Sequence, residues 1–222
     1  MPAIPLILAV DTTCEYGSLA LVRGSELLEE VPVHAPLSFG PVLYEALGHL
    51  LERNGVQLAD IACFAAASGP GTFTGVRIAL ACVKGLAEAT GRPVVGVSNL
   101  EAMAAYGTAP LRAVVLDARR GDIYGAVYDR AGVLVAPEVV SKPVPWLESL
   151  PAGIDEFVAT GVELPLAGTR FAGARVVTPP RAFAAVIARI AAGRCAQGQA
   201  TDPAVLDANY VRRTDAELAL KS

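Results

Sequence analysis

The amino-acid sequence predicts a mixed α/β fold in two similar halves, and three observations support this prediction. A pattern of apolar strand, aspartate, turn with glycine and second apolar strand, typical of a β-hairpin, occurs once in each half. Between the hairpins, an apolar strand, a glycine-rich loop and an apolar helix follow one another, as in α/β proteins. With 222 residues and 53% hydrophobic side chains, the chain is long enough for a substantial core. The hairpins comprise Ile4–Val10 and Ser18–Val22 around Asp11, and Ala113–Leu116 and Ile123–Tyr128 around Asp117.

Apolar periodicity predicts the other elements of the first half. Glu26–His34 is expected to form a third strand, and Pro32 favours an edge position. Apolar residues recur at helical spacing over 41–54 and over 75–89, and a glycine follows each stretch as a helix stop. Further elements are a buried strand at 61–67, a strand at 93–97, and a helix to about residue 107 that opens with the capping box Ser98–Glu101.

The second half repeats the strand and helix signals less regularly. The pattern restarts near Pro110, which predicts two subdomains, 1–107 and 108–222. The expected elements are strands at 132–140, 157–160 and 175–178, a short helical piece around Trp146 and a helix at 183–195. The tail from Thr201 is polar, with Tyr210 as its anchor.

The glycine-rich loop is the first candidate site. A strand, a loop of this kind and a helix N-terminus together favour anions, because free N–H groups and the helix dipole attract negative charge. The loop lacks the lysine of a Walker motif and is one residue too long for a dinucleotide fingerprint. Close packing of helix on strand is the other explanation for its glycines, and spacing alone leaves both open. The candidate residues are Ser68, Gly69, Pro70, Gly71, Thr72, Phe73, Thr74, Gly75 and Arg77.

Two of the charged residues near these turns raise questions of their own. Arg77 falls in the first turn of the predicted helix, where a cation opposes the helix dipole, so an anion, a carboxylate or a partner surface is expected nearby. Asp11 ends the first strand and can bind a metal ion or a phosphate-linked water. An aspartate followed by two threonines is equally common turn chemistry.

Composition excludes several classes of protein. A net charge of −4 and a pI near 5.2 argue against a chain that grips nucleic acid alone. No apolar run reaches the length of a membrane helix, and the N-terminus does not read as a signal peptide. The four cysteines have no C-x-x-C spacing, which fits a reduced, cytoplasmic protein. A mean hydropathy of +0.46 indicates apolar surface that a partner covers.

Three stretches carry a resemblance to a known family. They are SGPGTFTGVRIALACVKGLA from residue 68, ILAVDTTCEYGSLALV from residue 7 and VLDARRGDIYGAVYD from residue 115, and the closing NYVRRTDAEL fits as well. They resemble the TsaB (YeaZ) family, glycoprotease-like relatives of TsaD that help to make threonylcarbamoyladenosine (t6A) at adenosine 37 of tRNA. The resemblance implies two RNase H-like subdomains of the actin, Hsp70 and sugar-kinase superfamily type.

This superfamily resemblance bears on cofactors. Its ATPases hold phosphate on the two hairpin turns, usually with glycine soon after the aspartate. Here Thr12 and Thr13 follow Asp11, and Ala118 and Arg119 follow Asp117. We therefore expect no tightly bound cofactor, with ATP or ADP contacted only in an assembled complex.

The histidines bear on catalysis. The TsaD relatives hold a metal with an H-x-x-x-H motif on a helix, whereas this chain has only His34 and His49. Neither a metal site nor a catalytic residue is therefore expected. The resemblance implies a non-catalytic scaffold or activating subunit. A nucleotide-binding ATPase-like enzyme and a peptidase are the alternatives.

The resemblance also implies partners. These are a TsaD-like catalytic subunit, a TsaE-like ATPase, and tRNA reached indirectly through the complex, with no membrane. For the chain alone, a homodimer and a monomer are both left open. Pairing is expected through the helices at 41–54 and 75–89, because both are apolar beyond one narrow stripe. The predicted interface residues are Leu43, Leu47, Leu50 and Ala81. If these face the chain's own core instead, a charge there unfolds the protein.

Overall fold

The computed structural model describes residues 4–211, which divide into two compact units. Among the described residues, the first unit contains 4–102 and 180–209, and the second contains 103–179 together with 210 and 211. The first boundary lies close to the predicted one at 107. The second subdomain was predicted to continue to residue 222, and this is wrong for 180–209, which returns to the first unit. The reason is that the last helix packs on the first sheet.

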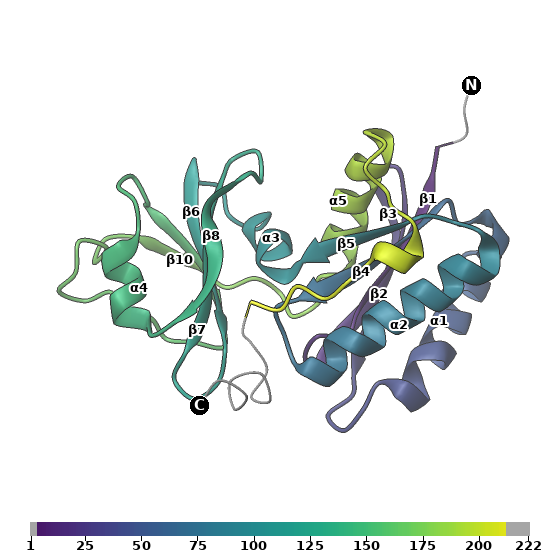
Figure 1. Cartoon of the computed structure of the whole chain (residues 1–222), viewed down its shortest axis with the longest axis horizontal. Helices are drawn as coiled ribbons and strands as arrows, with labels where there is room; N and C mark the ends of the chain where they lie inside the picture. Colours follow the sequence, from purple (N-terminus) through teal and green to yellow (C-terminus); the bar gives the residue numbers. More distant parts are fainter. Residues whose placement is uncertain (1–3, 212–222) are drawn as a thin grey trace. The chain divides into compact units, whose positions relative to one another are not determined.

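The first unit is built on a five-stranded sheet whose order is β3-β2-β1-β4-β5 (Figure 1). β1 pairs antiparallel with β2 and β2 with β3, whereas β1, β4 and β5 run parallel. The parallel strands are almost continuously apolar because helices cover both of their faces. The strands are β1 (Leu6–Asp11), β2 (Tyr16–Arg23), β3 (Glu26–His34), β4 (Cys63–Gly69) and β5 (Val94–Ser98).

Helices cover both faces of this sheet. α1 and α2 lie side by side over one face, and α5 packs on the other (Figure 1). Alternation along β1 separates the faces: Leu6, Leu8 and Val10 join the core under α1 and α2, so Asp11 points to the α5 side. The helical elements are α1 (Gly40–Arg53), α2 (Phe73–Thr90), α3 (Asn99–Ala104), α5 (Ala184–Ala196) and the 3₁₀ turns η1 (Leu58–Asp60) and η2 (Pro203–Val205).

α5 begins against two polar side chains of the sheet. The hydroxyl of Ser18 accepts the N–H of Ala184 at 3.0 Å, and the carboxylate of Glu30 accepts that of Ala185 at 2.9 Å. No side chain at the helix's own N-cap does this work. The sheet therefore supplies the cap, and the negative charge of Glu30 suits the positive end of the helix dipole.

The segment after α5, residues 201–209, reaches the glycine-rich loop, and we call it the strap. Thr201 bridges to Val94 of the edge strand β5, and the amine of Lys84 donates to the carbonyl of Leu206 at 2.8 Å. The N–H of Asn209 then donates to the carbonyl of Ser68 at 2.8 Å. The strap thus covers the sheet edge and fixes the end of β4.

The second unit repeats the topology of the first. Its sheet has the order β10-β9-β6-β7-β8, with the same antiparallel and parallel pairings in the same sequence. Its core stacks Trp146 and Phe171 edge-on against Phe157. The internal repetition predicted from the two hairpins is therefore confirmed. The elements are β6 (Leu111–Asp117), β7 (Ile123–Asp129), β8 (Leu134–Ser141), α4 (Pro143–Ser149), β9 (Glu156–Thr160) and β10 (Arg175–Val177).

Candidate functional site

The candidate site lies at the carboxyl ends of β1 and β4. These parallel neighbours end at the same sheet edge, which brings the turn after Asp11 to the loop after Ser68. The N–H of Thr72 donates to the carbonyl of Thr13 at 2.7 Å, and the hydroxyl of Thr12 donates to the carbonyl of Gly75 at 2.7 Å. The turn and the loop are therefore joined into one structure.

The glycine spacing is explained by this junction. A Cβ on Gly75 would overlap the carbonyl oxygen of Thr12, and one on Gly71 would lie 2.7 Å from the carbonyl oxygen of Thr13. Gly69 has φ +102°, which favours glycine, and the peptide bond from Gly69 to Pro70 is cis. Of the two explanations for the glycines, the geometry supports close packing, although the packing is of the loop and the start of α2 on the turn after Asp11 and not of helix on strand.

Several loop N–H groups are used inside the chain. Besides that of Thr72, the N–H of Gly69 donates to Asn99 at 3.3 Å, and that of Gly75 donates to the hydroxyl of Thr72, the helix N-cap, at 3.2 Å. These donors do not form a preorganised anion cradle, because an anion would have to displace their partners.

A buried polar chain ties the site together. Asp11 is 1% exposed, and one of its oxygens accepts the N–H of Thr13 at 2.9 Å and its hydroxyl at 2.6 Å. The amide of Asn99 donates to the same hydroxyl at 2.6 Å. Burial raises the pKa of Asp11 above its ordinary value, and the hydrogen bonds from Thr13 offset this only partly. The chain runs from Asp11 through Thr13 and Asn99 to Gly69.

Asn99 was not among the residues predicted for this site. The sequence placed it only inside a helix-start signal. In the structure it follows β5, the third parallel strand, and so reaches the same sheet edge as Asp11 and Ser68. A polar residue directly after a parallel strand was the signal that would have found it.

The two residues of the predicted capping box, Ser98 and Glu101, have different roles. Ser98 caps the helix start by accepting the N–H of Leu100 at 3.2 Å. The carboxylate of Glu101 pairs with Arg194 at 2.7 Å and so ties α3 to α5.

The exposed part of the loop is the first turn of α2. Thr72, Thr74 and Arg77 are exposed, and Phe73 is 46% exposed. The guanidinium of Arg77 lies 3.7 Å from the centre of the Phe73 ring. Part of the expected explanation for a cation at this helix end is thus a cation–π contact within the helix itself.

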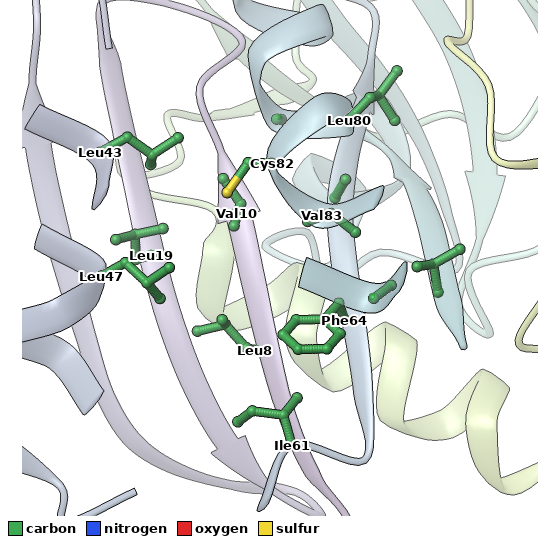
Figure 2. Close-up of a cluster of buried hydrophobic side chains, with 14 of the residues drawn as sticks. Leu8, Val10, Leu19, Leu43, Leu47, Ile61, Phe64, Leu80, Cys82 and Val83 are labelled. Atoms are coloured by element: carbon green, nitrogen blue, oxygen red, sulfur yellow. The ribbon is translucent and has the colours of Figure 1, made fainter. Parts of the chain in front are cut away.

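The leucines predicted as interface anchors face the chain's own core, and this prediction is corrected. Leu43, Leu47 and Leu50 are at most 4% exposed. Figure 2 shows Leu43 and Leu47 pointing from α1 onto the sheet beside Leu19. The most regular apolar stripe of an amphipathic helix is the one that packs on its own sheet. Ala81, by contrast, is exposed on α2.

The histidines lie apart. His34 stacks on the ring of Tyr16 with centroids 4.4 Å apart, and His49 is exposed on α1. Over residues 4–211, no three His, Cys, Asp or Glu side chains gather into a group that could hold a metal ion. Within the same residues, no helix combines the length and apolar character needed to span a membrane.

Comparison with known proteins identifies the family. Residues 31–194 match the family model TsaD, tRNA N6-adenosine threonylcarbamoyltransferase. The chain is also 33% identical over 149 residues to the tRNA threonylcarbamoyladenosine biosynthesis protein TsaB of Bacillus subtilis. The chain belongs to the TsaD family, and within it the chain is similar to the TsaB (YeaZ) proteins. The predicted resemblance is therefore confirmed.

The coverage of the TsaB relatives is partial. The match to the Bacillus subtilis protein spans 65% of this chain and 65% of that protein. TsaB of Escherichia coli is 35% identical over 129 residues, which are 56% of this chain and 55% of that protein. The matched segment is thus less than two thirds of the length of either relative.

A solved structure agrees over a longer stretch. A Pseudomonas aeruginosa protein described as similar to peptidase YEAZ has a TM-score of 0.78 and 29% identity, covering 94% of this chain and all of that one. Both units of this chain have the same strand order, and the predicted mixed α/β fold in two similar halves is confirmed. More distant structures share this fold, among them the ethanolamine utilization protein EutJ of Carboxydothermus hydrogenoformans, with a TM-score of 0.55 at 15% identity.

The second hairpin of this TsaB-family chain is more open than the first. The carboxylate of Asp117 accepts the N–H of Arg119 at 2.8 Å and lies 3.8 Å from its guanidinium, and its side chain is 29% exposed. Arg119 and Arg120 both have positive φ, and Gly121 follows with φ +73°. The closing segment that contributed to the resemblance lies mostly outside the described residues.

Proposed function

We propose that this chain is a non-catalytic subunit of a cytoplasmic complex that transfers threonylcarbamoyl to adenosine 37 of tRNA. In this proposal it pairs with a TsaD-like catalytic subunit and reaches tRNA only through the complex. The observation that carries the proposal is the match to two proteins named TsaB. The sequence also lacks the H-x-x-x-H pattern that TsaD relatives use to hold a metal, which favours a supporting role over catalysis.

The outward face of α1 and α2 is the proposed pairing surface. This surface consists of Val42, Tyr44, Gly48, Phe73, Ala81 and Gly85, all exposed. Tyr44 is 60% exposed, and a Cβ on Gly48 or Gly85 would meet no atom within 4 Å. Small residues among aromatic ones let a neighbouring helix approach closely, and aromatic side chains are enriched at interface centres. The interface prediction is thus retained for Ala81 and moved from the leucines to this surface.

A charge on this surface tests the proposal. Ala81→Glu and Gly48→Glu should leave the fold intact, because both positions are open, and should abolish pairing by burying an unpaired carboxylate. Pairing with a TsaD-like protein is measured by size-exclusion chromatography of the mixed proteins. Ala196→Glu, an exposed alanine at the end of α5, is the matched control and should pair normally.

Two outcomes of this experiment separate folding from pairing. Leu47→Glu places a charge in the core and should unfold the protein by circular dichroism, which marks the difference between the two faces of α1. Folded Ala81→Glu and Gly48→Glu proteins that pair as tightly as the unmodified chain contradict the proposed surface.

Nucleotide binding distinguishes the scaffold from an ATPase-like enzyme. We expect the isolated chain to bind ATP with a Kd weaker than about 1 μM, or less than about 8 kcal/mol of binding free energy. The reason is that the N–H groups of Gly69, Thr72 and Gly75 are already bonded and that neither hairpin aspartate is followed by glycine. Calorimetry measures this directly, and sub-micromolar binding supports the enzyme instead. In the proposed scaffold role, where this chain binds ATP weakly, a TsaE-like ATPase supplies the nucleotide chemistry of the complex.

A further inference from the structure

Two cysteines far apart in the sequence come together behind the first sheet. Cys63 begins β4 and is 1% exposed. Its neighbours Phe64 and Ala66 belong to the core under α1 and α2, whereas Cys63 does not. Because side chains alternate along a strand, Cys63 points to the α5 side.

The helix periodicity places Cys195 on the same side. Ala184, Ala188 and Ala191 are buried on α5, and Cys195 lies four residues beyond Ala191 on the same stripe. Cys195 is half-buried because it lies near the helix end.

The lengths of the elements bring the two residues to one level. α5 starts at Ser18, which pairs with Asp11 at the carboxyl end of β1, and from Ala184 to Cys195 it rises about 16 Å. Along the sheet, the level of Asp11 is four residues beyond that of Cys63, about 13 Å. The end of α5 therefore lies over the start of β4.

The two thiols interact directly. Hydrogen bonding to Cys195 raises the pKa of the Cys63 thiol, and the same bond lowers the pKa of Cys195. The sulfur of Cys63 also lies 3.5 Å from the carbonyl oxygen of Phe64, so its proton has two acceptors. Cys195 is thus the thiol of the pair with the lower pKa and the one that solvent reaches, whereas Cys63 is buried.

We propose that Cys63 and Cys195 are an oxidation site that forms a reversible disulfide with hydrogen peroxide as the oxidant. The Cys195 thiolate attacks one peroxide oxygen, the O–O bond breaks, and hydroxide leaves to give a sulfenic acid. The sulfur of Cys63 then attacks the sulfur of Cys195, the S–S bond forms, and the S–O bond breaks. The thiol protons and the released oxygens leave as two water molecules, so two thiols lose two electrons and peroxide gains them.

The other two cysteines provide internal controls. Cys14 is exposed in the first hairpin turn, and Cys82 is buried on α2, on the opposite face of the sheet. Neither lies on the α5 side at the start of β4. The disulfide would tie the sheet to its rear helix next to Arg194, whose ion pair already joins α5 to α3.

Peroxide treatment of the whole protein tests the proposal. A Cys14→Ser background prevents bonds between molecules, leaving three thiols. After peroxide, a thiol titration should count one remaining thiol, and mass spectrometry of a digest should find the Cys63 peptide joined to the Cys195 peptide. The melting temperature should rise by about 5 °C or more and return after dithiothreitol, because the bond closes a long loop.

Matched variants decide the outcome. Adding Cys195→Ser, at a half-buried position, should abolish the linked peptide and the rise in melting temperature, whereas adding Cys82→Ser should leave both unchanged. Oxidation of Cys195 to sulfinic acid without a linked peptide overturns the proposal. So does a melting temperature that responds to peroxide equally when Cys195 is serine.

Discussion

Asp11 and Asp117 end the first strands of two sheets with the same strand order, yet their surroundings differ. Asp11 is 1% exposed within a chain of hydrogen bonds that reaches Asn99 and Gly69. The side chain of Asp117 is 29% exposed, and it contacts Arg119 of its own turn.

The connection after the fourth strand of each sheet accounts for this difference. In the first unit, β4 leads through the glycine-rich loop into the 18-residue α2, and the loop bonds to the turn that follows Asp11. In the second unit, the described chain from β9 to β10 contains no helix. The turn after Asp117 closes with its own bonds, between Ala118 and Asp122 and between Asp122 and Arg119. Its outside contact is the exposed amine of Lys142, which lies 3.0 Å from the carbonyl oxygen of Arg120 and 2.7 Å from the carboxylate of Asp122. One topology thus supports a fixed turn or an open one, depending on the connection that packs against it.

The largest expected effect comes from Gly75→Ala. Helix propensity alone predicts a gain from this change, because Gly75 is in α2. The overlap of the new Cβ with Thr12 predicts a loss of about 3 kcal/mol or more in unfolding free energy. Urea unfolding measures it. Gly121→Ala in the second turn, where the nearest atom is 3.7 Å away, should cost only about 1–2 kcal/mol through its positive φ. Equal losses at the two sites would contradict the comparison.

A smaller effect is expected for Asn99→Ala. The change leaves the buried N–H of Gly69 without its acceptor and Thr13 without its donor, which should cost about 1–3 kcal/mol. It should also make the first turn behave like the second. Hydrogen–deuterium exchange of residues 11–16 should accelerate toward that of 117–122. Unchanged exchange in the first turn would mean that Asn99 does not hold it.

The pH dependence of stability tests the burial of Asp11. Because the pKa of Asp11 is raised by burial, the folded protein holds this proton more tightly than the unfolded chain does. Stability from this group is therefore fully present below its unfolded pKa of about 4 and is lost as the pH rises from there through the folded pKa. Asp11→Asn should weaken this loss as the pH rises above about 4, measured by urea unfolding at several pH values. An unchanged pH dependence in Asp11→Asn would contradict this role of the buried carboxyl group.

The smallest expected effect is a gain from Arg119→Gly. Arg119 has φ +66°, a conformation that costs a side chain energy and suits glycine. Part of the gain is cancelled by the greater freedom of glycine in the unfolded chain, so the net stabilisation should be at most about 1 kcal/mol. Thermal unfolding compares this variant with Thr13→Gly in the first turn, which should be destabilised through the loss of the hydroxyl bonded to Asp11. Stabilisation by both changes would argue that the first turn is as open as the second.

The sequence was sufficient for features that depend on local pattern. Alternation and turn residues predicted both hairpins, the equivalence of Asp11 and Asp117, and most strand and helix positions. It was not sufficient where distant segments decide. The spacing of Leu43, Leu47 and Leu50 marks an apolar stripe but does not say whether the sheet or a partner covers it. The requirement for glycine in the loop comes from its contact with Thr12 and Thr13, more than fifty residues earlier in the chain.

The sheet that the last helix covers could not be predicted from local pattern either. Residues 183–195 read as a helix from their own pattern, but which sheet that helix covers depends on the path of the whole chain. α5 returns to the first unit because Ser18 and Glu30 cap its start and β1, β2 and β4 receive its alanine stripe.

This return sets the order of events during synthesis. The face of the first sheet on which α5 packs, here called the rear face, stays uncovered until α5 leaves the ribosome. The 77 residues of 103–179 must be made first. At roughly 5–20 residues per second, that interval lasts about 4–15 s. During it, the apolar rear face, which includes Ile7 and Ala9, has no covering helix from its own chain. The five strands of the second unit all lie within residues 103–179, so its sheet can be completed earlier. A nascent chain halted before residue 180 is therefore a natural substrate for chaperones, although it already contains all five strands of the first sheet.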